Sequence, residues 1–181
     1  MTRPAAQVDP TPLPDALVLV TASADQTRRL ARAMAPLCRP GDVVLLVGDL
    51  GAGKTTFAQG FGAALGVTEP ITSPTFVLVR QYPMGDGAPV RVLVHADVYR
   101  LDRLHEIVEL GLGELVDDGG VALVEWGDAA QPVLGSGALT VKLAMDDDDD
   151  RRVITISALD GVWSGRWDGL AQALGSWRAD P

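Results

Sequence analysis

Two hydrophobic patterns alternate along the chain. The run VVLLV at residues 43–47 is unbroken and rich in β-branched and aliphatic residues, which is typical of a strand covered on both faces of a parallel sheet. An earlier stretch repeats its apolar positions at helical spacing, with Leu30, Met34 and Leu37 on one face. This stretch follows a capping-box pattern at residues 23–26. We therefore predict a helix to about residue 38 and then a central parallel strand.

The same patterns place the remaining elements. An apolar run at 17–20 precedes the first helix, and a glycine-rich break at 48–53 separates the central strand from a helix at 54–65, which Gly66 ends. Further strands are predicted at 76–81, 90–95, 121–125, 139–145 and 153–157, with helical turns around 101–110 and 169–177. These elements predict a single three-layer α/β domain over residues 15–181. Its central sheet is expected to be mainly parallel, with antiparallel additions near the C-terminus, after a Pro-rich flexible tail at 1–14.

Length and charge narrow the class of protein. The 181 residues are 47% hydrophobic, which suffices for one core of ordinary size. Acidic side chains outnumber basic ones by 24 to 15, for a formal net charge of -9, and aromatic residues make up only 5%. Such a surface repels phosphate backbones and offers no base-stacking platform. We therefore do not expect the chain to bind nucleic acid unaided.

The cysteine content and the apolar segments bear on the compartment. Cys38 is the only cysteine, which excludes an intramolecular disulfide and indicates a reducing environment. The sequence shows neither a signal-peptide pattern nor an apolar segment that approaches the roughly 18 residues of a membrane span. We expect a cytoplasmic protein with no membrane association.

The glycine-rich break carries the strongest chemical signal. Its residues match the pattern G-x-x-x-x-G-K-[ST], as Gly48, Asp49, Leu50, Gly51, Ala52, Gly53, Lys54 and Thr55. Glycines let the backbone curl so that N–H groups point at phosphate oxygens, and the positive end of the following helix favours an anion. Lys54 would supply charge to the β- and γ-phosphates, and the Thr55 hydroxyl can bind Mg²⁺. Because strand, loop and helix follow in order, a turn that merely caps a helix is disfavoured.

A phosphate site of this kind also needs a carboxylate at the end of a neighbouring strand. Asp97 and Glu125 each end an apolar run, and the residues alone do not rank them. For Asp97, an N-cap or an ion pair with Arg100 is as good an interpretation as a catalytic role. For Glu125, a solvated strand end is less favoured, because Trp126 follows it and indicates a packed turn near the phosphates.

Other polar residues carry weaker signals. The segment TSPTF at 72–76 is rich in hydroxyl groups, so Thr75 could contact a γ-phosphate, although an ordinary turn is an equal alternative. His95 and His105 do not form a spaced metal pair, and we interpret them as a core-edge and a helix-surface residue. The acidic run at 146–150 is interpreted as a solvated turn between strands.

Four segments taken together resemble the TsaE (YjeE) family. They are GDLGAGKTT at 48–56, SPTF at 73–76, HADVYRL at 95–101 and LVEW at 123–126. The resemblance covers about residues 23–157 and implies a P-loop NTPase-type domain that binds ATP and Mg²⁺ and hydrolyses ATP slowly on its own. It further implies action with TsaB and TsaD in forming N6-threonylcarbamoyladenosine at position 37 of tRNAs that read codons beginning with A, with the partners holding the tRNA.

The resemblance also implies roles for single residues. Thr55 and Glu125 become the magnesium ligands, and Asp97 becomes a second acidic residue of the active site beside Lys54. Thr56 and Thr75 would lie near the phosphates, and the region 23–30 would help to enclose the adenine. Phe76, where relatives often have Tyr, and Val98 are mild departures from the family pattern.

Three other functions compete with this interpretation. A P-loop small-molecule kinase is disfavoured because Arg100 and Arg103 form the only basic pair near the predicted site, too few for an arginine-rich lid. A regulatory GTPase is disfavoured because the chain has no asparagine and hence no Asn-Lys-x-Asp element. A non-hydrolytic adaptor, in which ATP only orders the loop 72–76 for a partner, stays open. No arginine finger is evident, so we expect low intrinsic turnover.

Overall fold

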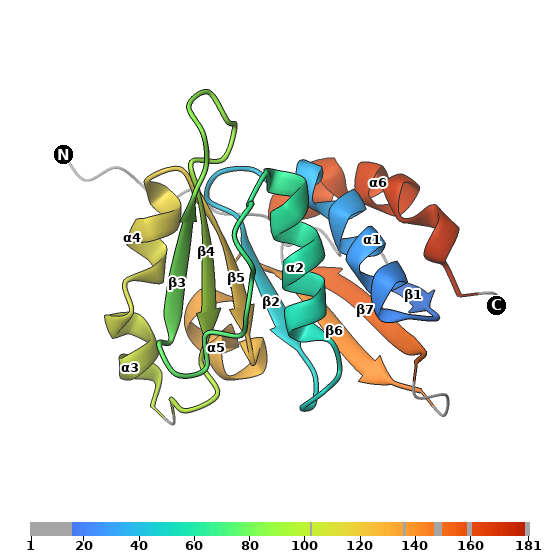
Figure 1. The fold of residues 1–181 in the computed structure, drawn as a ribbon, viewed down its shortest axis with the longest axis horizontal. Helices are drawn as coiled ribbons and strands as arrows, with labels where there is room; N and C mark the ends of the chain where they lie inside the picture. Colours follow the sequence, from blue (N-terminus) through green and yellow to red (C-terminus); the bar gives the residue numbers. More distant parts are fainter. Residues whose placement is uncertain (1–15, 102, 136, 147–149, 159–160, 180–181) are drawn as a thin grey trace.

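A seven-stranded mixed sheet organises the described part of the chain (Figure 1). The computed structural model describes residues 16–101, 103–135, 137–146, 150–158 and 161–179. The predicted tail at 1–14 and the middle of the acidic run, 147–149, lie outside the described residues. The strands are β1 (Leu17–Thr21), β2 (Val43–Val47), β3 (Val79–Pro83), β4 (Val92–Asp97), β5 (Gly120–Glu125), β6 (Leu139–Met145) and β7 (Arg152–Ala158).

The order of the strands is β1-β7-β6-β2-β5-β4-β3. The central four, β6, β2, β5 and β4, run parallel to one another. At one edge β7 and β1 add antiparallel strands, and at the other edge β3 pairs antiparallel with β4. The mainly parallel centre with antiparallel additions near the C-terminus is thus confirmed, and β3 adds an antiparallel strand at the opposite edge.

Helices cover both faces of the sheet (Figure 1). On one face lie α1 (Ala24–Met34), α2 (Lys54–Leu65) and α6 (Ser164–Ala173), and on the other lie α3 (Leu104–Glu109), α4 (Leu112–Asp117) and α5 (Gly127–Leu134). Strand alternation divides the core accordingly: Leu46 of β2 packs in the same cluster as Phe57 of α2, whereas Leu45 packs with Ile107 of α3. The predicted three-layer α/β architecture is confirmed. No helix among the described residues has the length and apolarity needed to cross a bilayer.

Local sequence explains where the two leading helices begin and end. The Ser23 hydroxyl accepts a hydrogen bond from the Gln26 N–H at 3.2 Å, and the Gln26 side-chain oxygen accepts one from the Ala22 N–H at 2.9 Å. These bonds satisfy N–H groups that a helix start leaves free. Helix α1 gives way at Met34 to a 3₁₀ turn at Ala35–Leu37, which contains Pro36. Helix α2 spans the predicted residues and ends at Gly66, whose φ is 98°.

Other boundaries differ from the prediction. Strand β3 begins at Val79 and not at 76, because the Pro74 carbonyl accepts hydrogen bonds from the N–H groups of Val77 and Leu78 and so forms a turn. Helix α6 begins at Ser164 instead of 169. The pattern did not predict α4 and α5, which have only 6 and 8 residues; α5 also contains Pro132.

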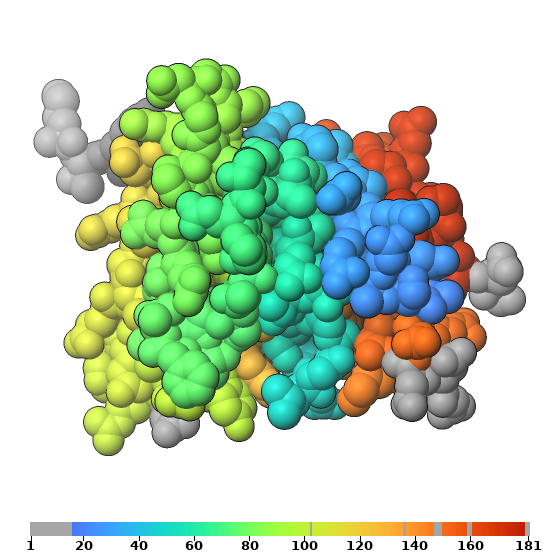
Figure 2. Space-filling view, in the orientation of Figure 1, coloured from blue at the N-terminus to red at the C-terminus, as the bar shows by residue number. Residues whose placement is uncertain are grey.

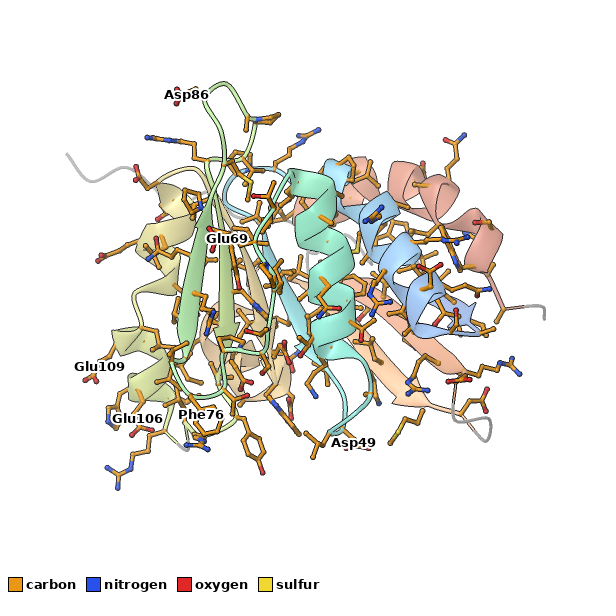
Figure 3. The ribbon with its side chains drawn as sticks, viewed as in Figure 1. Asp49, Glu69, Phe76, Asp86, Glu106 and Glu109 are labelled. Carbon is orange, nitrogen blue, oxygen red and sulfur yellow. The ribbon has the colours of Figure 1, made fainter. Side chains whose placement is uncertain are left out.

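The helices cover the faces of the sheet, and the loop after β2 lies at one end of the molecule (Figure 1). In the space-filling view, α2 and the segment that follows it cover the centre of the sheet, with α1 and α6 beside them (Figure 2). The tip of the loop after β2, marked by Asp49, lies at the same end as Phe76, whereas Asp86 in the β3–β4 hairpin lies at the opposite end (Figure 3). The carboxyl ends of the parallel strands and the start of α2 therefore meet at a single edge, where ligands of open α/β sheets bind.

Candidate active site

The two predicted carboxylates stand side by side at this edge. Asp97 is the last residue of β4, Glu125 is the last residue of β5, and the two are paired in register. Both side chains are almost fully buried, at 1% and 3% exposure. The sequence alone did not rank the two acids as candidates. The fold brings both of them to the site.

A cavity of about 340 Å³ opens over these acids. Its walls are Leu50, Gly51, Gly53, Lys54, Thr55, Thr56, Ser73, Thr75, Asp97, Glu125 and Trp126. Of the remaining predicted residues, Gly48 and Asp49 line a neighbouring cavity that also includes Lys142. Ala52 is buried at 1% exposure. Most of the residues predicted to bind a nucleotide thus share one cavity, and the other three belong to the same loop but do not line that cavity.

The glycine-rich loop, residues 48–53, is held by contacts that depend on its glycines and on a distant arginine. A Cβ atom at Gly48 would overlap the Leu143 carbonyl oxygen of β6, so only glycine fits this close approach. From the start of β7, Arg152 donates through Nε to the Ala52 carbonyl at 3.1 Å and through a terminal nitrogen to the Gly51 carbonyl at 3.4 Å. The sequence alone did not predict this role for Arg152.

Lys54 occupies the inner side of this loop. Its Nζ donates hydrogen bonds to the carbonyl oxygens of Gly48 at 2.6 Å and Asp49 at 2.9 Å, and it lies 3.9 Å from the centroid of the Trp126 ring. Burial lowers the pKa of the Lys54 ammonium from its ordinary value, and the nearby carboxylates, Glu125 foremost, act in the opposite direction. The two carbonyl acceptors are neutral and do not cancel the positive charge of the ammonium. Lys54 lines the cavity, so this charge lies in the cavity wall.

Thr55 and Glu125 form the acidic floor of the cavity. The Thr55 hydroxyl donates to the two carboxylate oxygens of Glu125, Oε1 at 2.9 Å and Oε2 at 3.2 Å. On the opposite side, His95 Nε2 lies 2.9 Å from Glu125 Oε1. His95 is fully buried, and its contact with a site carboxylate was not anticipated when it was interpreted as a core-edge residue.

Strand alternation could have indicated this contact. His95 and Asp97 are two residues apart on β4, so their side chains project from the same face of the sheet. Leu123 and Glu125 are related in the same way on the neighbouring strand, β5. The signal in the sequence is His95 itself, a polar residue two positions before the acid that ends its apolar run.

Asp97 fixes the loop 72–76 instead of capping a helix. Its Oδ2 accepts hydrogen bonds from the hydroxyls of Ser73 at 3.0 Å and Thr75 at 2.7 Å, and its Oδ1 accepts one from the Tyr99 N–H at 2.9 Å. Arg100, the alternative ion-pair partner, lies with its guanidinium 4.7 Å from the centroid of the Phe76 ring. Thr75 is therefore at the site as predicted, with its hydroxyl directed at a carboxylate.

Trp126 closes the wall of the cavity. It follows Glu125 directly and adopts a left-handed backbone conformation with φ 60°, which is uncommon for a bulky side chain. Its ring also contacts the Tyr99 ring, with centroids 4.7 Å apart. The packed turn that the sequence predicted after Glu125 is present, and it brings the indole against Lys54.

The described residues contain no group of three or more His, Cys, Asp or Glu side chains arranged to hold a metal ion by themselves. Mg²⁺ does not require such a group, because it is usually held by one or two carboxylates together with substrate phosphates and waters. Thr55 and Glu125 supply hard oxygen atoms beside Lys54, which is a donor set that suits Mg²⁺ bound to a phosphate.

A parallel α/β sheet whose central strand runs through a G-x-x-x-x-G-K-T loop into a helix is the architecture of P-loop proteins. Comparison with known proteins narrows this class. A family model described as Threonylcarbamoyl adenosine biosynthesis protein TsaE matches residues 21–154. The chain therefore belongs to the TsaE family, as the sequence resemblance predicted.

Individual relatives agree with the family match. The tRNA threonylcarbamoyladenosine biosynthesis protein TsaE of Bacillus subtilis (strain 168) is 41% identical over 154 residues, which are 85% of this chain and 90% of the relative. The protein of the same name from Streptomyces coelicolor is 42% identical over 142 residues, 76% of this chain and 93% of the relative. The crystal structure of Bacillus subtilis YdiB matches with a TM-score of 0.70 and 34% identity, covering 90% of this chain and 95% of that chain.

Proposed function

We propose that the protein binds ATP with Mg²⁺ in the 340 Å³ cavity and hydrolyses it slowly, as a component of the bacterial machinery that forms N6-threonylcarbamoyladenosine at position 37 of tRNAs reading codons that begin with A. It acts in the cytoplasm with TsaB and TsaD. The observation that carries the proposal is the convergence of Lys54, Thr55 and Glu125 at the start of α2, directly after the glycine-rich loop.

The chain's own groups suit a triphosphate. The first N–H groups of α2 have no helical acceptor, and the dipole of the helix favours an anion at this end. The Lys54 ammonium lies on carbonyl oxygens of the loop and can turn toward entering phosphate oxygens. Bound Mg²⁺, held by Thr55 and Glu125, supplies charge neutralisation for phosphoryl transfer.

A second, smaller cavity supports the proposed position of the adenine. It has a volume of about 90 Å³ and joins the loop at Gly51 and Gly53 to the start of α1 at Ala24 and Thr27. Thr56 lines this cavity as well as the main one. A nucleotide whose phosphates occupy the main cavity would thus extend toward residues 23–30, the region expected to enclose the base.

We expect slow ATP hydrolysis because the nearby arginines already contact other groups of the protein. Arg100 lies over the Phe76 ring, and Arg152 donates to carbonyls of the loop. An arginine that stabilises the transition state accelerates such reactions by about 10³ to 10⁵. We therefore attribute faster hydrolysis to assembly with TsaB and TsaD. The net charge of -9 fits a protein whose partners hold the tRNA.

Calorimetry of ADP and ATP binding in the presence of Mg²⁺ tests the nucleotide site. Lys54→Ala should weaken binding roughly tenfold or more, because hydrogen bonds to charged groups contribute about 1.5–3 kcal/mol. Lys142→Ala is the matched control, because it removes the only other lysine of the chain, and that residue is exposed in the neighbouring cavity. Absence of measurable binding by the folded wild-type protein would refute the proposal.

Glu125→Ala separates the enzyme from a non-hydrolytic adaptor. ATP hydrolysis by the isolated chain should be slow, should rise when TsaB and TsaD are added, and should be lost in Glu125→Ala while ATP still binds. If the variant supports tRNA modification as well as the wild type does, hydrolysis is dispensable and the adaptor function is correct. Fast hydrolysis by the isolated chain would contradict the proposed dependence on partners.

A further inference from the structure

His95 has the surroundings of a residue that serves the site. It is the only histidine inside the described core, with no exposed surface, and its Nε2 lies 2.9 Å from Glu125 Oε1. Its other ring nitrogen, Nδ1, is buried and has no hydrogen-bond partner among the described residues. A side chain that filled space alone would not need a polar ring at this position, where Leu93 of the same strand packs into the apolar core.

The surroundings of the two ring nitrogens indicate which of them donates to Glu125. A proton on Nε2 gives Glu125 a hydrogen bond and leaves Nδ1 as a buried acceptor. A proton on Nδ1 would turn the Nε2 lone pair toward the carboxylate and leave a buried N–H without an acceptor, and orphaned buried N–H groups are rare. Nε2 is therefore the nitrogen that donates to Glu125 Oε1.

This hydrogen bond sets the orientation of the Glu125 carboxylate. Oε1 accepts from His95 on one side and from Thr55 at 2.9 Å on the other, which restricts rotation of the carboxylate about its terminal bond. Oε2 accepts only the longer of the two Thr55 contacts, at 3.2 Å, among the described hydrogen bonds. Oε2 therefore keeps more capacity than Oε1 to bind a ligand in the cavity, which Glu125 and Thr55 both line.

We propose that His95, as a hydrogen-bond donor through Nε2, is a positioning residue that fixes the Glu125 carboxylate for Mg²⁺. The inference rests on the proposed function, because it concerns the metal that would accompany the nucleotide. His95 does not reach the cavity lining itself and acts through Glu125. Partners that orient metal ligands in this way typically change metal affinity by about 10- to 100-fold when they are removed.

Three substitutions separate orientation from packing. His95→Gln keeps an amide N–H at about the reach of Nε2, His95→Asn carries the same amide one carbon shorter, and His95→Leu fills similar space without a donor. Mg²⁺ is titrated at fixed ADP and followed by calorimetry, with ADP affinity in EDTA as the internal reference. We expect His95→Leu and His95→Asn to weaken Mg²⁺ roughly tenfold or more, and His95→Gln to retain most of the affinity.

A second test is made on the wild-type protein and does not require substitution of the buried His95. A long-range ¹H–¹⁵N spectrum distinguishes the tautomers of the two histidines in the chain, and His105→Gln, at an exposed site on α3, assigns them. A proton on Nε2 is expected for His95. A ring whose Nε2 carries no proton overturns the proposal, as does Mg²⁺ affinity that is equal in His95→Gln and His95→Leu. If the wild type binds no nucleotide with Mg²⁺, the proposed function fails, and the spectrum still decides the role of His95 as a donor.

Discussion

At the scale of single residues, the candidate site is ordered by its own hydrogen bonds. Lys54 is held by loop carbonyls, Thr55 and His95 converge on Glu125, and Asp97 holds the hydroxyls of the loop 72–76. Such bonds fix the side chains before a ligand arrives, which reduces the entropy that binding would otherwise cost. We therefore expect the Glu125 and Asp97 carboxylates to keep their positions when the proposed nucleotide binds, whereas the Lys54 ammonium turns toward the phosphates.

The single cysteine offers a residue-scale prediction about pH. Burial raises the pKa of the Cys38 thiol far above its ordinary value, and Asp42 acts in the same direction. A raised pKa keeps the thiol protonated, and the protonated form is unreactive. At about pH 8, near the pKa of a free thiol, we expect a thiol reagent to label the native protein very slowly. In denaturant it should label one group per chain. Native labelling at the rate of a free thiol would contradict this.

The sequence predicted the positions of site residues that are close together in the chain or that end strands. The loop and Lys54 form one contiguous motif, and Asp97 and Glu125 end apolar runs, so most of these residues line one cavity. Their roles in binding and catalysis stay predictions. The contacts of His95 and Arg152 join positions 30 and 100 residues apart. Such contacts depend on strand order and register, which the hydrophobic pattern does not specify.

At the scale of elements, α1 and α2 approach each other closely on the sheet. Gly60, in the middle of α2, has its Cα against α1, where a Cβ atom would overlap the carbonyl oxygen of Arg28. The same two helices are joined by a hydrogen bond from Arg28 Nε to the Gln59 side-chain oxygen at 3.3 Å. The absence of a side chain at Gly60 therefore allows the short distance between α2, whose first residues belong to the site, and α1.

Gly60→Ala tests this packing. Because backbone atoms of α1 would have to move, we expect the free energy of unfolding to fall by about 1–3 kcal/mol, the usual cost of overpacking. Gly169→Ala is the matched control, since Gly169 lies in α6 with open space around it. There alanine should raise stability by about 0.5–1 kcal/mol through helix propensity. Urea unfolding of both variants gives the values, and equal effects would show that helix contact is not limiting.

Elements with strong patterns matched their predicted bounds, whereas short ones did not. β2, α2 and β6 span the residues predicted for them. β2 is an unbroken apolar run, α2 is bounded by glycines, and β6 alternates buried with less buried residues. Helix α4 contains Gly113, and neither α4 nor α5 is long enough for a helical repeat to stand out. Their burial against β5 and β2 is a tertiary effect that local propensity does not reveal.

At the scale of the whole molecule, an arginine near the C-terminus joins distant parts of the chain. Arg166 of α6 forms two hydrogen bonds with Asp42, at 2.5 and 2.8 Å, just before β2. Its guanidinium also lies 3.8 Å from the centroid of the Trp163 ring and donates to the Leu37 carbonyl. The Arg166 and Asp42 side chains are only 12% and 7% exposed, so the pair is largely shielded from water.

Arg166→Leu should destabilise the whole molecule. Removing one partner leaves a buried carboxylate without its counter-charge, which typically costs about 3–5 kcal/mol. Arg29→Ala, which breaks the exposed pair with Asp25 within α1, should cost about 0.5 kcal/mol or less. Thermal and urea unfolding provide the comparison. Similar losses in the two variants would mean that the Asp42 pair contributes no more than a surface contact.

The pairing of β1 with β7 has a consequence for how the protein is made. Leu17 lies opposite Ile156, and the glycine-rich loop rests on Leu143 and Arg152. A ribosome releases Leu17 and the loop long before these later residues emerge, so the nascent chain has an open strand edge and an unsupported loop. The proposed nucleotide site is completed only when the last strand has been translated, so the proposed nucleotide would not assist the earliest steps of folding.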